Sequence, residues 1–318
     1  MTSTLQNSFS TVIERELATL TDSGPLGDAA RTLVLAPGAK RARPWLVRTF
    51  GEAAGVHTTE ALIDAAVAVE LIHSASLLHD DVVDQAELRR GRPTANARLG
   101  NTLAVLSGDW VLTCALERLA RRPMLLRPAI EAVAQMTKAI AAEVAARGDA
   151  TLTLAAWTDI ARGKTGALFA LCGRLVGLIA RDEDRAEAFA QAGMHLGVAF
   201  QLADDLADLF GLDGKGRFND LSNASPSYPL LWAAARDPSL AADLRTLWSS
   251  SSSCAELDVE QLGARVLTLG AADATATAAQ REVEQARLAL GADATRPSLV
   301  TLLGWAEALV GSVRRAAR

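Results

Sequence analysis

The sequence predicts an all-α protein, a single large helical bundle. Ala and Leu dominate the composition, and β-branched residues almost never alternate with polar ones. Apolar residues instead recur at three- and four-residue spacing, which is the period of an amphipathic helix. No shift in composition marks a domain boundary, so residues 1–318 are interpreted as one domain.

The individual helices follow from where these apolar stripes begin and end. The clearest stripe runs from Thr58 to Asp84, where Thr58 or Thr59 can cap the start. The last predicted helix has Pro297 in its first turn, where a proline is tolerated. Between the stripes stand Gly and Pro residues. Further helices are predicted at residues 102–119, 128–146, 157–178, 184–209, 228–235, 272–290 and 297–314.

Composition and charge exclude several classes of function. The 318 residues are 50% hydrophobic with a formal net charge of −5, so no basic field is available for nucleic acid or anionic lipid. No apolar run is long enough for a membrane span, and no secretory leader is visible. The cysteines are scattered without metal-ligand spacing, which favours a reducing compartment: Cys114, Cys172 and Cys254. We therefore expect a cytoplasmic protein.

Two aspartate clusters, DDVVD and DDLAD, each end an apolar helical run. Residues four apart lie on one face of a helix, so the first and last carboxylates of each cluster project together. Such a cluster can be a solvated acidic face. It also suits Mg²⁺, which prefers a few carboxylates together with water and phosphate oxygens. Two such helices facing each other would place the clusters across a cavity. The clusters comprise Asp80, Asp81, Asp84, Asp204, Asp205 and Asp208.

Four basic motifs accompany the clusters: GAKRARP at residues 38–44, RRGRPTAN at 89–96, GKTG at 163–166 and GKGRFNDL at 214–221. Lys and Arg can bind a diphosphate directly, Arg through its planar fork and Lys as a point charge. GKTG is not a phosphate-binding loop, because it lacks the earlier Gly of that motif and a preceding strand. Each motif alone is typical of a protein surface, and only their joint occurrence around two aspartate clusters indicates a site.

ELIHSASLLHDDVVDQAELRRGRPTAN at residues 70–96 and FQLADDLADLFG at 200–211 resemble the two aspartate-rich regions of the trans-type polyprenyl diphosphate synthases. This family includes farnesyl, geranylgeranyl and longer-chain synthases. The resemblance runs from about Gly38 to Leu231 and is weaker toward the C-terminus. It implies the isoprenoid synthase type of all-α fold around a central apolar cavity. It also implies a Mg²⁺-dependent prenyltransferase that condenses isopentenyl diphosphate with an allylic diphosphate, works as a homodimer and holds three Mg²⁺ ions with substrate bound.

The resemblance also implies roles for single residues. Metal ligands would be Asp80, Asp81, Asp84, Asp204 and Asp208, with Asp205 in support. Residues at the allylic substrate would be Arg89, Lys164, Thr165, Gln201 and Lys215, with the aromatic Phe200 beside the reacting carbons. Arg89 and Lys164 would join the aspartates in catalysis. The isopentenyl diphosphate pocket would hold Lys40, Arg43, His73 and Arg90. The elongation channel would be lined by Ala75 and Ser76.

The chain departs from the family pattern in three motifs, and its loops before Trp157 and between Asp208 and Lys215 are shorter than the family's. The Gly-Lys pair that usually precedes Pro-Leu-Leu is Ala224-Ser225, so one diphosphate-binding lysine is missing. The GExxQ motif keeps Glu143 but has Ala146 instead of Gln. The first basic motif has GAKR instead of GGKR. These changes concern substrate affinity and rate and leave the aspartates intact.

Two alternative functions remain open at this stage. A terpene cyclase of the same fold usually carries one DDxxD and an NDxxSxxxE-type motif, which Asn219 to Ser222 begin but Asn223 and Ser227 do not complete. A non-catalytic subunit of a heteromeric synthase would explain the missing Lys and Gln, but both aspartate clusters are present.

A small residue at Ala75 favours a geranylgeranyl or longer product, because the related farnesyl synthases have a bulky aromatic there.

Overall fold

The computed structural model describes residues 2–20, 24–36, 41–89, 91–212, 216–249 and 258–316. Within these ranges, the chain is helical apart from turns and one two-stranded hairpin, so the predicted all-α class is confirmed. The chain groups into two compact units. Unit 1 comprises Met1–Val133, Leu171–Ala190 and Arg296–Leu299. Unit 2 comprises Ala134–Ala170, Gln191–Thr295 and Val300–Arg318. The reading of the whole chain as one domain remains a prediction.

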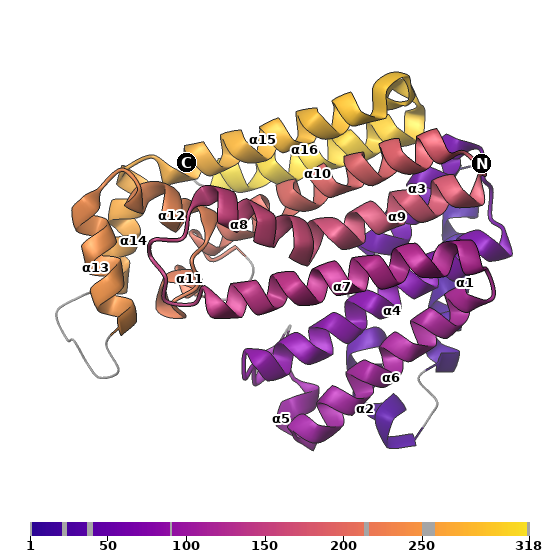
Figure 1. Cartoon of the computed structure of the whole chain (residues 1–318), viewed down its shortest axis with the longest axis horizontal. Coiled ribbons are helices and arrows are strands. Elements are labelled where there is room, and N and C mark those ends of the chain that lie inside the picture. Colours follow the sequence, from indigo (N-terminus) through magenta and orange to yellow (C-terminus); the bar gives the residue numbers. More distant parts are fainter. Residues whose placement is uncertain are drawn as a thin grey trace. The chain divides into compact units, whose positions relative to one another are not determined.

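Unit 1 contains the first six helices and the hairpin (Figure 1). These are α1 (Thr2–Leu20), α2 (Gly24–Val34), α3 (Ala42–Ala54), α4 (Glu60–Val83), β1 (Leu88–Arg89), β2 (Arg92–Pro93), α5 (Ala95–Leu99) and α6 (Asn101–Ala120). The strands pair antiparallel, with Arg89 opposite Arg92. The contact between α4 and α6 is the most extensive in the unit, and α1, α2 and α3 also pack on α4.

The helix α4 begins where the Thr59 hydroxyl accepts a hydrogen bond from the Leu62 N–H, so the second of the two predicted caps is the one used. Most of its side chains are buried, including the carboxylates of Asp64, Glu70 and Asp81. Asp64 accepts from Arg118, and Glu70 accepts from the Arg41 guanidinium at 2.8 Å. By length and hydropathy alone, α4 could cross a membrane, but 72% of its most apolar window is buried in the protein, as in a core helix.

Unit 2 builds its own core from shorter helices and the last two long ones. It contains α8 (Leu154–Ala161), a π-helical turn (Arg162–Gly166), α11 (Asn219–Ser222), α12 (Tyr228–Ala234), α13 (Pro238–Ser249), α14 (Val259–Thr268), α15 (Ala271–Leu290) and a 3₁₀ turn (Gly291–Thr295). Figure 1 shows α15 running along α16 (Pro297–Ala316), and Arg287 of α15 pairs with Glu307 of α16 at 2.6 Å. Four helices contribute to both units: α7 (Pro123–Ala145), α9 (Ala167–Ile179), α10 (Glu183–Asp208) and α16.

The observed bounds correct two of the predicted helices. The helix predicted from residue 128 begins at Pro123, where the missing N–H costs nothing, and Pro128 lies inside it. The helix predicted at 157–178 is three segments, α8, the π-helical turn and α9. Pro297 opens α16 as predicted. The sequence analysis did not predict the helices α1, α2, α3, α5, α11, α13 and α14.

Candidate active site

The first aspartate region occupies the last turn of α4 in unit 1. Asp84 ends the helix, and its N–H donates to the Asp80 carbonyl at 2.8 Å, so the two residues lie one turn apart on the same face. Asp80 is half-buried and Asp84 is exposed. This arrangement confirms the predicted helical geometry and leaves both carboxylates within reach of a ligand from solvent.

The third member of this region, Asp81, points into the protein and is only 2% exposed. Its Oδ1 accepts from Nε and Nη2 of Arg89, each at 2.7 Å. The hairpin delivers Arg89 to this point, because its two strands turn the chain back directly after α4. Burial raises the pKa of Asp81, and the guanidinium opposes that rise. Two residues predicted to contact metal and diphosphate are therefore paired with each other.

His79, which precedes the aspartates, ties α4 to α6. Its Nε2 lies 3.3 Å from the Val105 carbonyl oxygen and 3.2 Å from Asp109 Oδ1. The ring rests directly over Gly108, where an added Cβ would collide with it. A side chain at position 108 would therefore force the His79 ring to move from its present place. The sequence analysis gave His79 no role, because its partners are distant in sequence.

Three further predicted residues lie on α4 before the aspartates. Ala75 is buried, and Ser76 is half-buried with its hydroxyl donating to the His73 carbonyl. His73 is half-buried. The described structure assigns no ligand to these residues, so their predicted roles in the elongation channel and the isopentenyl diphosphate pocket remain predictions.

The second aspartate region ends α10 in unit 2, and its first member, Asp204, is exposed. Asp205 is buried and belongs to a hydrogen-bonded chain. The Thr165 hydroxyl donates to Gln201, the Gln201 amide donates to Asp205 at 2.9 Å, and the Tyr228 N–H donates to the other Asp205 oxygen at 2.9 Å. Burial raises the pKa of Asp205 to about 7 despite these donors. The predicted role of Asp205 in supporting the metal ligands remains a prediction.

Asp208 is buried beneath the short helix α11. Its Oδ1 accepts from the backbone and side-chain N–H groups of Asn219, and its Oδ2 accepts from the Asp220 N–H at 3.0 Å. Both oxygens therefore hold the turn that follows α10, which was not expected of a predicted metal ligand. Burial raises the pKa of Asp220 well above its usual value, and the Asp205 and Asp208 carboxylates raise it further.

The GKTG motif lies in the π-helical turn between α8 and α9, so a helix directly precedes it and not the strand that a phosphate-binding loop requires. A side chain at Gly163 would collide with Ala139 of α7, and one at Gly166 would collide with Met194 of α10. The two glycines therefore allow close packing of the turn. Lys164 between them pairs with both carboxylate oxygens of Glu143, at 2.7 and 2.6 Å. π-Helical turns occur frequently at functional sites.

Phe200 belongs to a row of three aromatic side chains in unit 2. Its ring centroid lies 5.6 Å from that of Phe169 and 6.3 Å from that of Trp305, nearly parallel to the latter. The sequence analysis did not identify Phe169 or Trp305. Trp305 comes from α16, where the resemblance to the family is weak, so no motif marked it.

The loop after α11 contains the departure Ala224-Ser225. Ala224 has a left-handed backbone with φ of 53°, a conformation that glycine adopts without strain. Its carbonyl accepts from the Gly148 N–H, and the Ser225 N–H donates to the Asp220 carbonyl. Ala224 therefore has a backbone conformation that favours glycine, and a half-buried serine stands where the family has its lysine.

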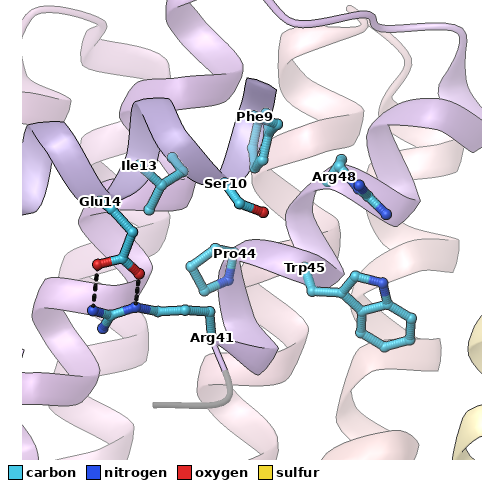
Figure 2. A pocket seen from close by; sticks show the side chains of 8 residues that line it. All are labelled: Phe9, Ser10, Ile13, Glu14, Arg41, Pro44, Trp45 and Arg48. Atoms are coloured by element: carbon cyan, nitrogen blue, oxygen red, sulfur yellow. Dashed lines mark hydrogen bonds and ion pairs between the residues drawn. The ribbon is translucent and has the colours of Figure 1, made fainter. Parts of the chain in front are cut away.

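The first basic motif divides between structural and predicted binding roles. Arg41 donates to Glu14 through Nε at 2.6 Å, and also to Glu70 and to the Val34 carbonyl, so it ties α1, α2, α3 and α4 together. Figure 2 shows Arg41 and Glu14 on one side of a cavity of about 190 Å³ between α1 and α3. None of the predicted site residues lines that cavity. At 100° per residue, Arg43 lies on the opposite face of α3, where its carbonyl contacts the Cys172 thiol.

Three predicted residues, Lys40, Arg90 and Lys215, lie outside the described residues.

Among the residues that are described, no three His, Cys, Asp or Glu side chains converge closely enough to hold a metal ion by themselves. The donor chemistry nevertheless fits Mg²⁺. Accessible carboxylates at Asp80, Asp84 and Asp204 are the hard oxygen ligands that Mg²⁺ uses together with water and substrate phosphate oxygens.

Comparisons with known proteins place this geometry in a family. Residues 26–264 match the Polyprenyl synthetase family. A heptaprenyl diphosphate synthase component 2 from Geobacillus stearothermophilus is 32% identical over 82% of this chain and 81% of its own length. The (2E,6E)-farnesyl diphosphate synthase of Mycobacterium tuberculosis is 38% identical over 62% of this chain, and the match spans only 57% of that relative.

Solved structures of polyprenyl synthases have the same fold as this chain. A decaprenyl diphosphate synthase from Rhodobacter capsulatus superposes with a TM-score of 0.89 and 28% identity over 97% of both chains. A polyprenyl synthase from Caulobacter crescentus, complexed with calcium and isoprenyl diphosphate, gives a TM-score of 0.83 and 29% identity over 98% of this chain and 95% of its own. The chain has the all-α isoprenoid synthase fold and belongs to the polyprenyl synthetase family.

Proposed function

We propose that the protein is a Mg²⁺-dependent prenyltransferase that joins isopentenyl diphosphate to an allylic diphosphate and releases a linear all-trans polyprenyl diphosphate. The observation that carries the proposal is the pair of aspartate regions, each at the end of a long helix with its first carboxylate accessible and its buried carboxylates held in place by hydrogen bonds. The Caulobacter relative, with calcium and isoprenyl diphosphate bound, supports a metal and diphosphate site of this kind.

Different residues of the chain would bind the metal, bind the diphosphate and exclude water from the reacting carbons. When bound at Asp80, Asp84 and Asp204, magnesium would supply charge neutralisation for the departing diphosphate. Lys164 and Arg89 add cationic donors to the allylic diphosphate. The delocalised allylic cation is attacked by the double bond of isopentenyl diphosphate, and the proton then lost passes to the diphosphate by-product. Phe200 would lie beside the reacting carbons and exclude water there.

The direct test is turnover by the purified chain alone. We expect isopentenyl diphosphate to be consumed with dimethylallyl, geranyl or farnesyl diphosphate in the presence of Mg²⁺, and EDTA to abolish turnover. Cyclic terpene formation from an allylic diphosphate alone would contradict the proposal in favour of a cyclase. Absence of turnover without a second protein, with turnover restored by one, would indicate a subunit of a heteromeric synthase. Homodimer formation and a cytoplasmic location remain predictions.

The product is proposed to be geranylgeranyl diphosphate or longer, because α4 has the small, buried Ala75 at the position where the related farnesyl synthases have a bulky aromatic. We expect Ala75→Tyr to shift the main product toward farnesyl diphosphate, because packed interiors have few voids that could absorb the added volume. Chromatography of the dephosphorylated products measures the shift. A wild-type protein that already stops at farnesyl diphosphate, or a variant with unchanged product length, would contradict this assignment of Ala75.

A further inference from the structure

Glu143 is an acidic residue directly beside a proposed diphosphate-binding lysine. Both of its carboxylate oxygens accept from Lys164 Nζ, at 2.7 and 2.6 Å. The side chains of Lys164 and Glu143 are 32% and 35% exposed, so the ion pair is reachable from solvent. A carboxylate in this place repels an approaching anion. Its presence therefore needs a reason other than attraction of the substrate.

The helix α7 fixes the position of this pair. One helical turn before Glu143, Ala139 packs so closely on Gly163 that no side chain fits there. The same face of α7 therefore holds the backbone of the π-helical turn through Ala139 and the lysine ammonium through Glu143. Lys164 is thereby held at both its backbone and its charged end.

Such restraint matters for a lysine more than for most residues. Its four-carbon side chain has about 2 kcal/mol of rotamer entropy, which a ligand would otherwise have to remove on binding. Ion pairs that are partly exposed to solvent add little to folding stability, so stability is a weak reason for this one. The ammonium has three N–H donors and can keep a bond to Glu143 while it binds a phosphate oxygen. In addition, Ala146 replaces the Gln of the family motif, so Glu143 is the motif's remaining polar side chain.

We infer that Glu143 is a positioning residue that holds the Lys164 ammonium in place for the allylic diphosphate. The inference rests on the proposed function, since it takes the allylic diphosphate as the ligand of Lys164. Glu143 itself contacts no substrate. Its effect is to order the lysine before the substrate arrives, so its loss weakens allylic binding and leaves the binding of isopentenyl diphosphate unchanged.

The test compares Glu143→Ala and Glu143→Gln in steady-state kinetics with both substrates varied. We expect Glu143→Ala to raise KM for the allylic diphosphate by up to about thirty-fold, which corresponds to the lysine's full ordering cost, with KM for isopentenyl diphosphate unchanged. Glu143→Gln keeps a hydrogen-bond acceptor and should recover most of the loss. Glu131→Ala is the matched control, because it removes an exposed ion pair with Arg127 on the same helix.

A double-mutant cycle separates positioning from a structural effect. In a Lys164→Ala background, Glu143→Ala should have no further effect on the allylic KM, because no lysine remains to be positioned. The inference is overturned if Glu143→Ala tightens allylic binding, which would mean that the carboxylate only competes with diphosphate. It is also overturned if both KM values rise together or if the cycle is additive. A wild-type protein without turnover would instead contradict the proposed function.

Discussion

The two aspartate regions have almost the same sequence, yet their buried carboxylates have different partners. In DDVVD, the buried Asp81 is held by a cation, the Arg89 guanidinium delivered by the hairpin. In DDLAD, Asp205 and Asp208 are held by neutral donors, namely backbone N–H groups and the amides of Gln201 and Asn219. In both regions the first carboxylate, at Asp80 or Asp204, is accessible. The repeated motif therefore specifies the accessible carboxylates and leaves the buried ones to local structure.

The difference has an electrostatic consequence. Asp81 is paired with a guanidinium. In unit 2, burial and neighbouring carboxylates raise the pKa of Asp205 and of Asp220, and the Lys164 ammonium only partly offsets the rise at Asp205. A cluster of buried carboxylates without a cation is destabilised by desolvation and by mutual repulsion. We therefore expect the second region to depend more on bound metal for its stability than the first region does.

The largest expected effect concerns the accessible carboxylates of Asp80 and Asp204, which have equivalent positions in the two aspartate regions. Asp80→Asn and Asp204→Asn should each lower kcat by about a hundred-fold or more, because a metal-bound charge stabiliser of the departing diphosphate is lost. Unfolding temperatures in EDTA should stay close to wild type. The measurements are kcat at saturating Mg²⁺ and thermal melts. A fall in activity that follows a fall in melting temperature would mean that these aspartates are structural.

Substitution of Asp208 should instead reduce the stability of the fold, because this residue holds the turn between α10 and α11. Asp208→Ala leaves three N–H donors without their acceptor and should lower the free energy of unfolding by about 3 kcal/mol. Urea denaturation in EDTA measures the change. Asp204→Ala on the same helix end is the control and should change stability by less than about 0.5 kcal/mol. Equal effects of the two substitutions would remove the distinction between accessible and buried members.

A pH-dependent difference tests the desolvation of Asp205. Its pKa is about 7 in the folded protein against 3.8 as the ordinary value, so between these pH values the folded state binds the extra proton. Wild-type stability without metal should therefore fall as pH rises from about 4 to 7. Asp205→Asn removes the titration, and its stability relative to wild type should rise over this window by on the order of 4 kcal/mol. A difference that stays constant with pH would contradict the raised pKa.

The smallest expected effect concerns the loop that replaces the family's Gly-Lys pair. Ala224→Gly should relieve the left-handed backbone strain and raise the free energy of unfolding by about 1 kcal/mol. Urea denaturation measures it. As a control, Ala156→Gly inside α8 should lower stability by a similar amount, since glycine is unfavourable in a regular helix. If both substitutions destabilise, the Ala224 backbone is not strained.

The two helices that end in the aspartate clusters could be predicted from the periodicity of their apolar residues. The stripes that lead into Asp80 and Asp204 are long and apolar, and each cluster does lie at a helix end. The partners of the buried carboxylates could not be predicted, because they depend on the path of the chain after each helix. Nothing in the sequence around Asp208 indicates that its carboxylate accepts hydrogen bonds from Asn219 and does not bind a metal. The π-helical turn was also missed, because RGKTG has the composition of an ordinary helix end or loop.

That turn determines how the segments on either side of it are aligned. A π-helical turn holds one residue more than an α-helical turn, so Lys164 projects toward Glu143 while Trp157 before it and Phe169 after it are both buried. Regular α-helical geometry over the same five residues would rotate the side chains that follow by roughly 100°. The bond from Thr165 to Gln201 would then be lost. The backbone geometry of this segment is therefore under a stricter constraint than the identity of most of its residues.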